Sequence, residues 1–138
     1  MLKKLLKVTM LMIIGVVLCA CTKKVTYKNL VGTYTDATNN AVMEITANEI
    51  EGVNIKIQRE NQANDVNTWT MTAKLEESKL SYKDSELNRR VTDENGNEII
   101  SILEYKDREG SFDPEVGKIS WTGAEEEEYK GFVFTKNK

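Results

Sequence analysis

Residues 53–58, Val-Asn-Ile-Lys-Ile-Gln, alternate apolar and polar side chains without a break. The same period of two appears on both sides of this stretch, in residues 41–47 and 69–75. Successive side chains of a strand point to opposite faces of a sheet, so the pattern predicts strands with one buried face. Because no stretch beyond residue 21 has an apolar stripe with helical spacing, the sequence predicts an all-β fold.

Shorter segments of the same kind follow, separated by turn-forming residues. Further strands are predicted at residues 30–34, 80–82, 99–105, 119–121 and 132–134. Breakers lie at residues 39–40, 48–52, 84–85, 95–96, 109–110, 114–117 and 123. Asn95-Gly96 predicts a two-residue type I′ hairpin, in which both central residues have positive φ. Short strands joined by close turns predict an antiparallel meander, either a sandwich or an up-and-down barrel.

One short sequence occurs twice. Leu-Ser-Tyr-Lys-Asp-Ser-Glu at residues 80–86 matches Leu-Glu-Tyr-Lys-Asp-Arg-Glu at residues 103–109 in five of seven positions. We interpret each copy as a strand end with two inward residues, followed by a polar turn. The irregular spacing to a third, weaker copy at residues 119–125 argues against a solenoid.

The first 21 residues have a different composition. Three lysines precede an apolar stretch of eleven residues, Val8 to Leu18. That stretch is shorter than the roughly 20 apolar residues needed to cross a bilayer. A basic start, a short apolar segment and a small residue, Ala20, are typical of a secretory signal peptide, which we expect to be helical.

The end of this segment resembles the lipobox of bacterial lipoproteins. Leu18 lies three places before the expected cut, Cys19 two places before it, Ala20 directly before it and Cys21 directly after it. The resemblance implies cleavage between Ala20 and Cys21 and a thioether-linked diacylglyceryl group on Cys21. Two acyl chains hold a protein stably in a membrane. The implied location is the extracytoplasmic face of the cell membrane, with the membrane as partner through Cys21.

The expected organisation is therefore a lipoprotein signal peptide at residues 1–20, a lipidated tether at 21–29 and a single β-barrel domain at 30–138. Two alternatives stay open for the N-terminus. The protein could be secreted after the same cut with a free thiol at Cys21, or it could keep a transmembrane helix.

Loss of the signal peptide changes the charge of the chain. The three lysines take the basic count from 19 to 16, against 22 acidic residues, so the net charge becomes −6. Nucleic-acid binding needs clustered Lys and Arg, so we expect no nucleic-acid partner. With Cys21 the only cysteine left, no internal disulfide can form. A domain of this size can fold without one, and we expect a monomer.

The domain resembles lipocalin-like barrels at its start. Leu30-Val31-Gly32-Thr33-Tyr34 is similar to the opening strand of that family, with Tyr34 where the family favours tryptophan. Residues 110–112 and 117–121 resemble segments of small lipocalin-like lipoproteins of Firmicutes, most of them uncharacterised. The resemblance implies a meander barrel of about eight to ten strands. It implies no particular ligand, because fold does not carry function.

The sequence offers little catalytic chemistry. It has no histidine, the commonest general base and metal ligand, and no cysteine outside the signal region and the lipid site. We expect no enzyme, no cofactor and no metal site. Glu44 is expected on the outer face of a strand, and Asp113 in a turn before Pro114. The four glutamates at residues 125–128 are expected to form a solvated loop.

The aromatic residues can be interpreted in two ways. They could form the packed core of a small domain, which we favour because protein interiors are normally filled, or they could line a ligand pocket. The residues concerned are Tyr34, Trp69, Tyr82, Tyr105, Trp121, Phe132 and Phe134.

Three function classes remain. The leading hypothesis is a lipid-anchored, non-catalytic binding domain for a small apolar ligand, a glycan or a protein partner. The second is a lipoprotein inhibitor of a cell-wall-degrading enzyme such as lysozyme. The third and weakest is an enzyme that relies on carboxylates alone.

Overall fold

The computed structural model describes residues 24–50, 52–124 and 131–138. The predicted signal peptide, the expected cleavage site at Ala20 and Cys21, and the glutamates at 125–128 lie outside the described residues. Within those ranges, no helix has both the length and the hydrophobicity that crossing a bilayer requires.

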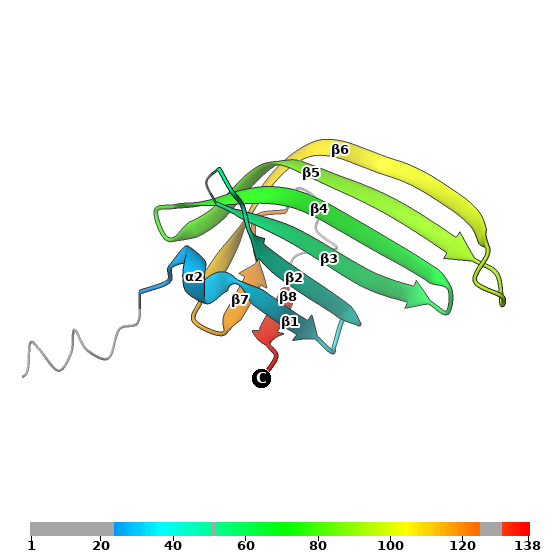
Figure 1. Cartoon of the computed structure of the whole chain (residues 1–138), viewed down its shortest axis with the longest axis horizontal. Coiled ribbons are helices and arrows are strands. Elements are labelled where there is room, and N and C mark those ends of the chain that lie inside the picture. The colour runs from blue at the N-terminus through cyan, green and yellow to red at the C-terminus, as the bar shows by residue number, and fades with distance from the viewer. Residues whose placement is uncertain (1–23, 51, 125–130) are drawn as a thin grey trace, which may run out of the picture.

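Eight strands form one closed antiparallel barrel in which every strand pairs with its neighbours in the chain (Figure 1). The last strand closes on the first through the pairs Tyr34–Lys136 and Thr35–Thr135. This confirms the predicted all-β class and antiparallel lipocalin-like meander, with eight strands. The elements are α2 (Tyr27–Leu30), β1 (Gly32–Asp36), β2 (Ala41–Ala47), β3 (Val53–Gln62), β4 (Asp65–Glu76), β5 (Lys79–Thr92), β6 (Glu98–Glu115), β7 (Lys118–Trp121) and β8 (Phe132–Lys136).

Residues 53–58, whose alternation predicts the fold, lie in β3, where the pairing with both neighbouring strands is regular. Ile57 of β3 pairs with Met43 of β2 on one side and with Trp69 of β4 on the other. All three side chains are fully buried, whereas the polar residues between the apolar ones are exposed. The period of two thus builds the inner wall of the barrel directly.

The strands differ greatly in length, which the sequence does not predict. β1, β7 and β8 have 5, 4 and 5 residues, whereas β5 has 14 and β6 has 18. The turns predicted at residues 84–85 and 109–110 are wrong. Both segments lie inside strands, at a shift in pairing register between Tyr82 and Ser85. A bulge absorbs the extra polar residue there, so the strand continues instead of turning.

Consequently β5 and β6 project past the short strands of the barrel (Figure 1). We call residues 87–104, which comprise the outer ends of these two strands and their connection, the β5–β6 arm. Ile100 and Ile102 belong to a segment, residues 99–105, that was predicted to be a strand of the barrel. They lie on the arm instead and are 38% and 44% exposed, because the barrel does not extend far enough to cover them.

Two hairpins differ from the predicted turn chemistry. The hairpin at Asn95-Gly96 exists, but its connection has five residues, 93–97, and only Gly96 has positive φ, at 83°. Asp93 organises this longer loop by accepting hydrogen bonds from the backbone N–H groups of Asn95 and Asn97. The connection with two consecutive positive φ values is Glu77-Ser78, between β4 and β5, at 48° and 70°.

The segment predicted as a tether is partly folded. Thr26 caps α2 by accepting a hydrogen bond from the Asn29 backbone, and the Asn29 side chain accepts one from the Thr26 backbone. Tyr27 packs against the core, and its hydroxyl accepts a hydrogen bond of 2.8 Å from the Leu75 N–H. Leu30, predicted to open the first strand, is instead the buried end of α2.

Candidate functional site

Aromatic side chains fill the interior of the barrel. Trp121 lies at the centre of this cluster, with its ring centroid 5.6 Å from that of Trp69, 5.2 Å from that of Phe112 and 6.0 Å from that of Phe132. All four rings are 2% exposed or less. The predicted aromatic core is confirmed, except that Tyr105 is half-buried and that Phe112 was not among the predicted core aromatics.

The polar atoms of the two interior tryptophans are hydrogen-bonded. The indole N–H of Trp121 donates to the Tyr82 hydroxyl at 2.9 Å, and that of Trp69 donates to the Tyr105 hydroxyl at 2.9 Å. The hydroxyl of Tyr34 donates to the Leu30 carbonyl at 2.7 Å, and burial raises the pKa of Tyr34. Such pairing removes the cost of burying these groups and fixes the rings in place. Because the aromatic interior is filled, the outer surface of the barrel is the place to expect a binding site.

A groove of about 380 Å³ lies on the outer face of the sheet formed by β2 to β5. Strand alternation places two parallel rows of polar side chains there. The first row is Glu44, Lys56, Thr70 and Glu86, each paired with the next across neighbouring strands. The second row is Thr46, Asn54, Thr72 and Asp84.

A defect in the sheet forms the floor of this groove. The pairing of β4 with β5 shifts register between Thr70 and Ala73, and that of β5 with β6 shifts just beyond Tyr82. The backbone N–H of Thr72 therefore donates to the Asp84 carboxylate at 2.8 Å. Where the strands separate, the groove reaches the buried side chain of Met71. Bulges often serve to re-aim side chains in this way.

The groove is rich in hydrogen-bond acceptors and is acidic. Its lining contains the carboxylates of Glu44, Asp84 and Glu86 but a single cationic side chain, Lys56. Carboxylates only accept hydrogen bonds, and they favour ligands that bring N–H donors and positive charge. Among the residues that the structure describes, no group of three or more potential ligand side chains is arranged to hold a metal ion.

Glu44 and Asp113, whose positions were predicted from the sequence, lie on different parts of the barrel. Glu44 lies on the outer face, as predicted, and lines the groove. Asp113 does not lie in a turn. It belongs to β6, pairs with Ser120 of β7 and accepts a hydrogen bond of 2.8 Å from the Thr122 hydroxyl. The turn follows later, at Val116-Gly117, because Pro114 is accommodated within the strand.

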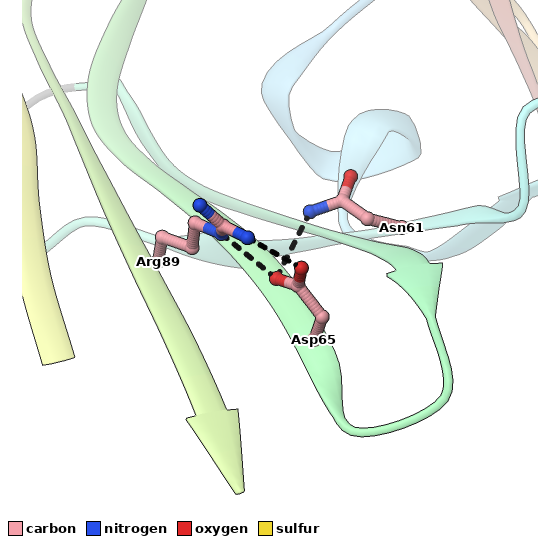
Figure 2. A network of polar contacts seen from close by, with 3 residues as sticks. All are labelled: Asn61, Asp65 and Arg89. Carbon is pink, nitrogen blue, oxygen red and sulfur yellow. Dashed lines mark hydrogen bonds and ion pairs between the residues drawn. The ribbon is translucent and has the colours of Figure 1, made fainter. Parts of the chain in front are cut away.

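A second polar cluster stabilises the base of the β5–β6 arm (Figure 2). The Arg89 guanidinium donates to both carboxylate oxygens of Asp65, at 3.0 and 2.7 Å, and the Asn61 amide donates to the same carboxylate at 3.3 Å. The hydrogen bond from Arg89 is the main reason that the pKa of Asp65 falls to about 2. Since the Asp65 carboxylate is fully engaged, this cluster is structural and carries no free chemistry.

Sequence reasoning missed Asp84 and Glu86 as members of a site. Asp84 belongs to the segment predicted to form a turn and Glu86 follows it, so their alternation with the buried Ser85 and Leu87 was not used. The sequence signal that could have found Glu86 is its alternation with Ser85 and Leu87, which places its side chain on the outer face. No family model, curated protein or solved structure matches this chain.

Proposed function

We propose that this protein is a lipid-anchored, non-catalytic binding domain on the extracytoplasmic face of the membrane, and that its outer groove recognises a basic segment of a protein partner. The observation that carries the proposal is the pair of side-chain rows on β2 to β5, with three carboxylates and one lysine. A ligand with Lys or Arg side chains and free amide donors matches this lining best.

The packed interior supports recognition outside the barrel. A small apolar ligand would need a cavity lined by apolar side chains. The buried rings of Trp69, Phe112 and Trp121 occupy that space by contacting one another. The aromatic interior therefore does not favour an apolar ligand inside the barrel, and the acidic lining of the groove favours a basic protein segment over a neutral glycan.

The anchor is inferred from residues 18–21, and the fold is compatible with it. The described residues begin at Lys24, three positions after Cys21, and Tyr27 of α2 already packs against the barrel core. A barrel held on so short a segment would work close to the membrane surface. Its net negative charge gives it no attraction to anionic lipids, so the lipid must supply the attachment.

Binding in the groove is expected to be modest and sensitive to salt. Exposed ion pairs each contribute about 0.2–1 kcal/mol. Charges at a surface are screened over about 8 Å at physiological ionic strength. We therefore expect rapid, reversible binding that weakens as salt is raised.

A labelled hexalysine peptide tests the proposal by fluorescence anisotropy with the purified protein. The variant Glu44→Gln/Glu86→Gln is expected to bind about 2- to 30-fold more weakly, as two exposed ion pairs predict. The matched control is Glu76→Gln/Glu77→Gln, which removes the same charge at the β4–β5 turn. Equal loss in both variants, or preferential binding of a neutral oligosaccharide, would contradict the proposed ligand class.

A second candidate function, inhibition of a cell-wall-degrading enzyme, rests on the tip of the β5–β6 arm. The carboxylate of Asp93 accepts hydrogen bonds from two backbone N–H groups and from the Asn97 amide, and these bonds lower its pKa. The tip is thus preorganised, which an inserted inhibitory loop requires. Full activity of a muramidase at micromolar inhibitor would exclude this function. Inhibition that Asp93→Ala abolishes would support it.

A further inference from the structure

Over much of its length, one edge of β6 has no partner among the described strands. β5 pairs with β6 from Glu98 onward, but β7 reaches it only at Phe112–Glu115. Among the residues that the structure describes, no strand pairs with the other edge of β6 over residues 98–104. Such an edge presents a row of free backbone N–H and C=O groups, which is a template for another strand.

The exposed edge is also apolar. Ile99, Ile100, Ile102 and Leu103 are 63%, 38%, 44% and 50% exposed. Ile100 shares a sheet face with Val91, whereas Leu103 is paired with Asn88 and lies on the opposite face. Apolar groups therefore flank the free edge on both faces of the sheet. Natural edges are usually protected by charge or proline, so an uncovered apolar edge indicates an interface.

The sequence of this edge is symmetric. Ile99-Ile100-Ser101-Ile102-Leu103 has the same pattern of apolar residues in both directions about Ser101. We propose that β6 of one molecule pairs with β6 of a second molecule, antiparallel and in register about Ser101, so that the two barrels share one continuous sheet. A two-fold interface needs such self-complementarity, because each residue meets the same strand in reverse.

The symmetric register is the one that matches apolar residues with apolar residues. It places Ile100 opposite Ile102 and Ile99 opposite Leu103 of the partner. Centring the pair at Ile100 would place Glu98 opposite Ile102. Centring it at Ile102 would place Glu104 opposite Ile100. Both shifts bury an isoleucine against a carboxylate, so the sequence disfavours them.

The geometry of β6 limits the pairing to this segment. Its pairing with β5 is regular from Ile100 to Leu103 and shifts register on both sides of that stretch. Asp107 has a positive φ of 56°, which breaks the extended backbone. Bulges turn an edge away from further partners. The flat part of the edge therefore contains three of its four exposed apolar residues, Ile100, Ile102 and Leu103, and Ile99 lies at its end.

The register brings Glu98 opposite Glu104 of the partner, and the two like charges would repel each other. Arginines of β5 reduce this repulsion. Arg90 Nε lies 3.3 Å from the Glu98 carboxylate. Arg89, the neighbouring arginine, is electrostatically attracted to Glu104. Glu98 thus has an arginine partner on its own molecule, and Glu104 lies within the field of the Arg89 charge, which is bonded to Asp65.

The proposed dimer differs from the monomer expected from the sequence. Its interface is the free edge of β6, whereas the groove lies over β2 to β5, so the dimer can form whether or not a basic ligand binds. Anchoring two copies in one membrane would raise their effective concentration and favour the pair.

Disulfide cross-linking of the detergent-solubilised full-length protein tests the register. In the proposed pair, residue 101 faces its own symmetry mate, with Cα atoms about 4.5–5.5 Å apart. That separation suits a disulfide. Ser101→Cys is therefore expected to give a covalent species of twice the chain mass under oxidant, well above the background of the parent chain with its native cysteines.

Glu98→Cys is the matched control on the same edge. Its symmetry mate would lie about 20 Å away, at six residues of strand, so Glu98→Cys alone should not cross-link. A mixture of Ile100→Cys and Ile102→Cys chains should cross-link, because these positions face each other within the regular stretch. Cross-linking of Glu98→Cys alone as efficient as that of Ser101→Cys, absence of a dimer at Ser101→Cys, or a product of another mass would overturn the proposal.

Sedimentation of a variant with a substituted edge residue tests the same interface without a cross-link. Ile102→Glu removes two symmetry-related apolar pairs and is expected to weaken self-association by about tenfold or more in sedimentation experiments. Because this side chain is exposed, the variant should keep the circular dichroism and thermal midpoint of the parent. Unchanged self-association in a folded Ile102→Glu protein would contradict the interface.

Discussion

Trp69 and Tyr105 are joined by a hydrogen bond in which the indole N–H donates to the phenolic oxygen at 2.9 Å. Trp121 and Tyr82 form the same bond at the same length. Tyr82 and Tyr105 hold the same place in the two copies of the Leu-x-Tyr-Lys-Asp-x-Glu sequence. The repeat therefore marks two bulged strand segments, each of which supplies a tyrosine to a buried tryptophan.

Removal of either hydroxyl should destabilise the barrel. Tyr82→Phe takes the acceptor from a buried indole N–H and is expected to lower the free energy of unfolding by about 1–3 kcal/mol. Tyr105→Phe should cost less, because Tyr105 is half-buried and water can reach the site. Urea denaturation followed by tryptophan fluorescence measures both. An equal or larger loss for Tyr105→Phe would contradict this account of the core.

The Asp65–Arg89 pair predicts a specific dependence of stability on pH. Folding lowers the pKa of Asp65 from 3.8 to about 2, so the pair stabilises the protein above the unfolded pKa. This contribution is lost as the pH falls from about 4 toward 2. The urea midpoint of the parent should therefore fall more steeply over this range than that of Asp65→Asn. Parallel profiles for the two proteins would contradict the assignment.

Substitutions in the β4–β5 turn should stabilise the protein. Glu77 and Ser78 both have positive φ, which costs a residue with a Cβ about 1–2 kcal/mol in the left-handed region. Glu77→Asn/Ser78→Gly is expected to raise the free energy of unfolding by about 1 kcal/mol. Asn95→Gly serves as the control, since Asn95 does not have positive φ and should gain nothing. Stabilisation by the control alone would reverse the assignment of the two turns.

The proposed lipid anchor has a close internal control. A clickable fatty acid should label the parent chain and Cys19→Ala in cells, whereas Cys21→Ala should lose the label and keep its signal peptide. In-gel fluorescence and intact mass distinguish the three proteins. Equal labelling of Cys21→Ala and the parent would show that the lipid site is elsewhere or absent.

The sequence predicts the regular part of this fold well. In β2, β3 and the centre of β4, the apolar residues at a period of two are buried in the interior, except Ala47 at the end of β2, so alternation alone defines most of the wall. It fails at residues 84–85 and 109–110, because a bulge and a turn use the same polar residues. Which of the two forms depends on the partner strand, and no local pattern contains that information.

The groove was unpredictable for a related reason. Its floor exists because pairing between β4 and β5 shifts register after Thr70, which separates the strands over Met71. Glu44 could be placed outward from its own strand, but its proximity to Glu86 depends on the register of three strand pairs. The apolar part of the arm was likewise predicted only as one more strand of the barrel, because alternation does not reveal where a barrel ends.

The most direct test of recognition outside a filled barrel is a titration of the isotope-labelled protein with hexalysine, followed by NMR. The chain has two tryptophans, and both lie in the interior, so their indole N–H signals report on that region. The account predicts shifts at the groove residues Thr46, Thr70 and Thr72. It also predicts that the signals of Trp69 and Trp121 remain in place. Shifted indole signals with an unchanged groove would contradict it.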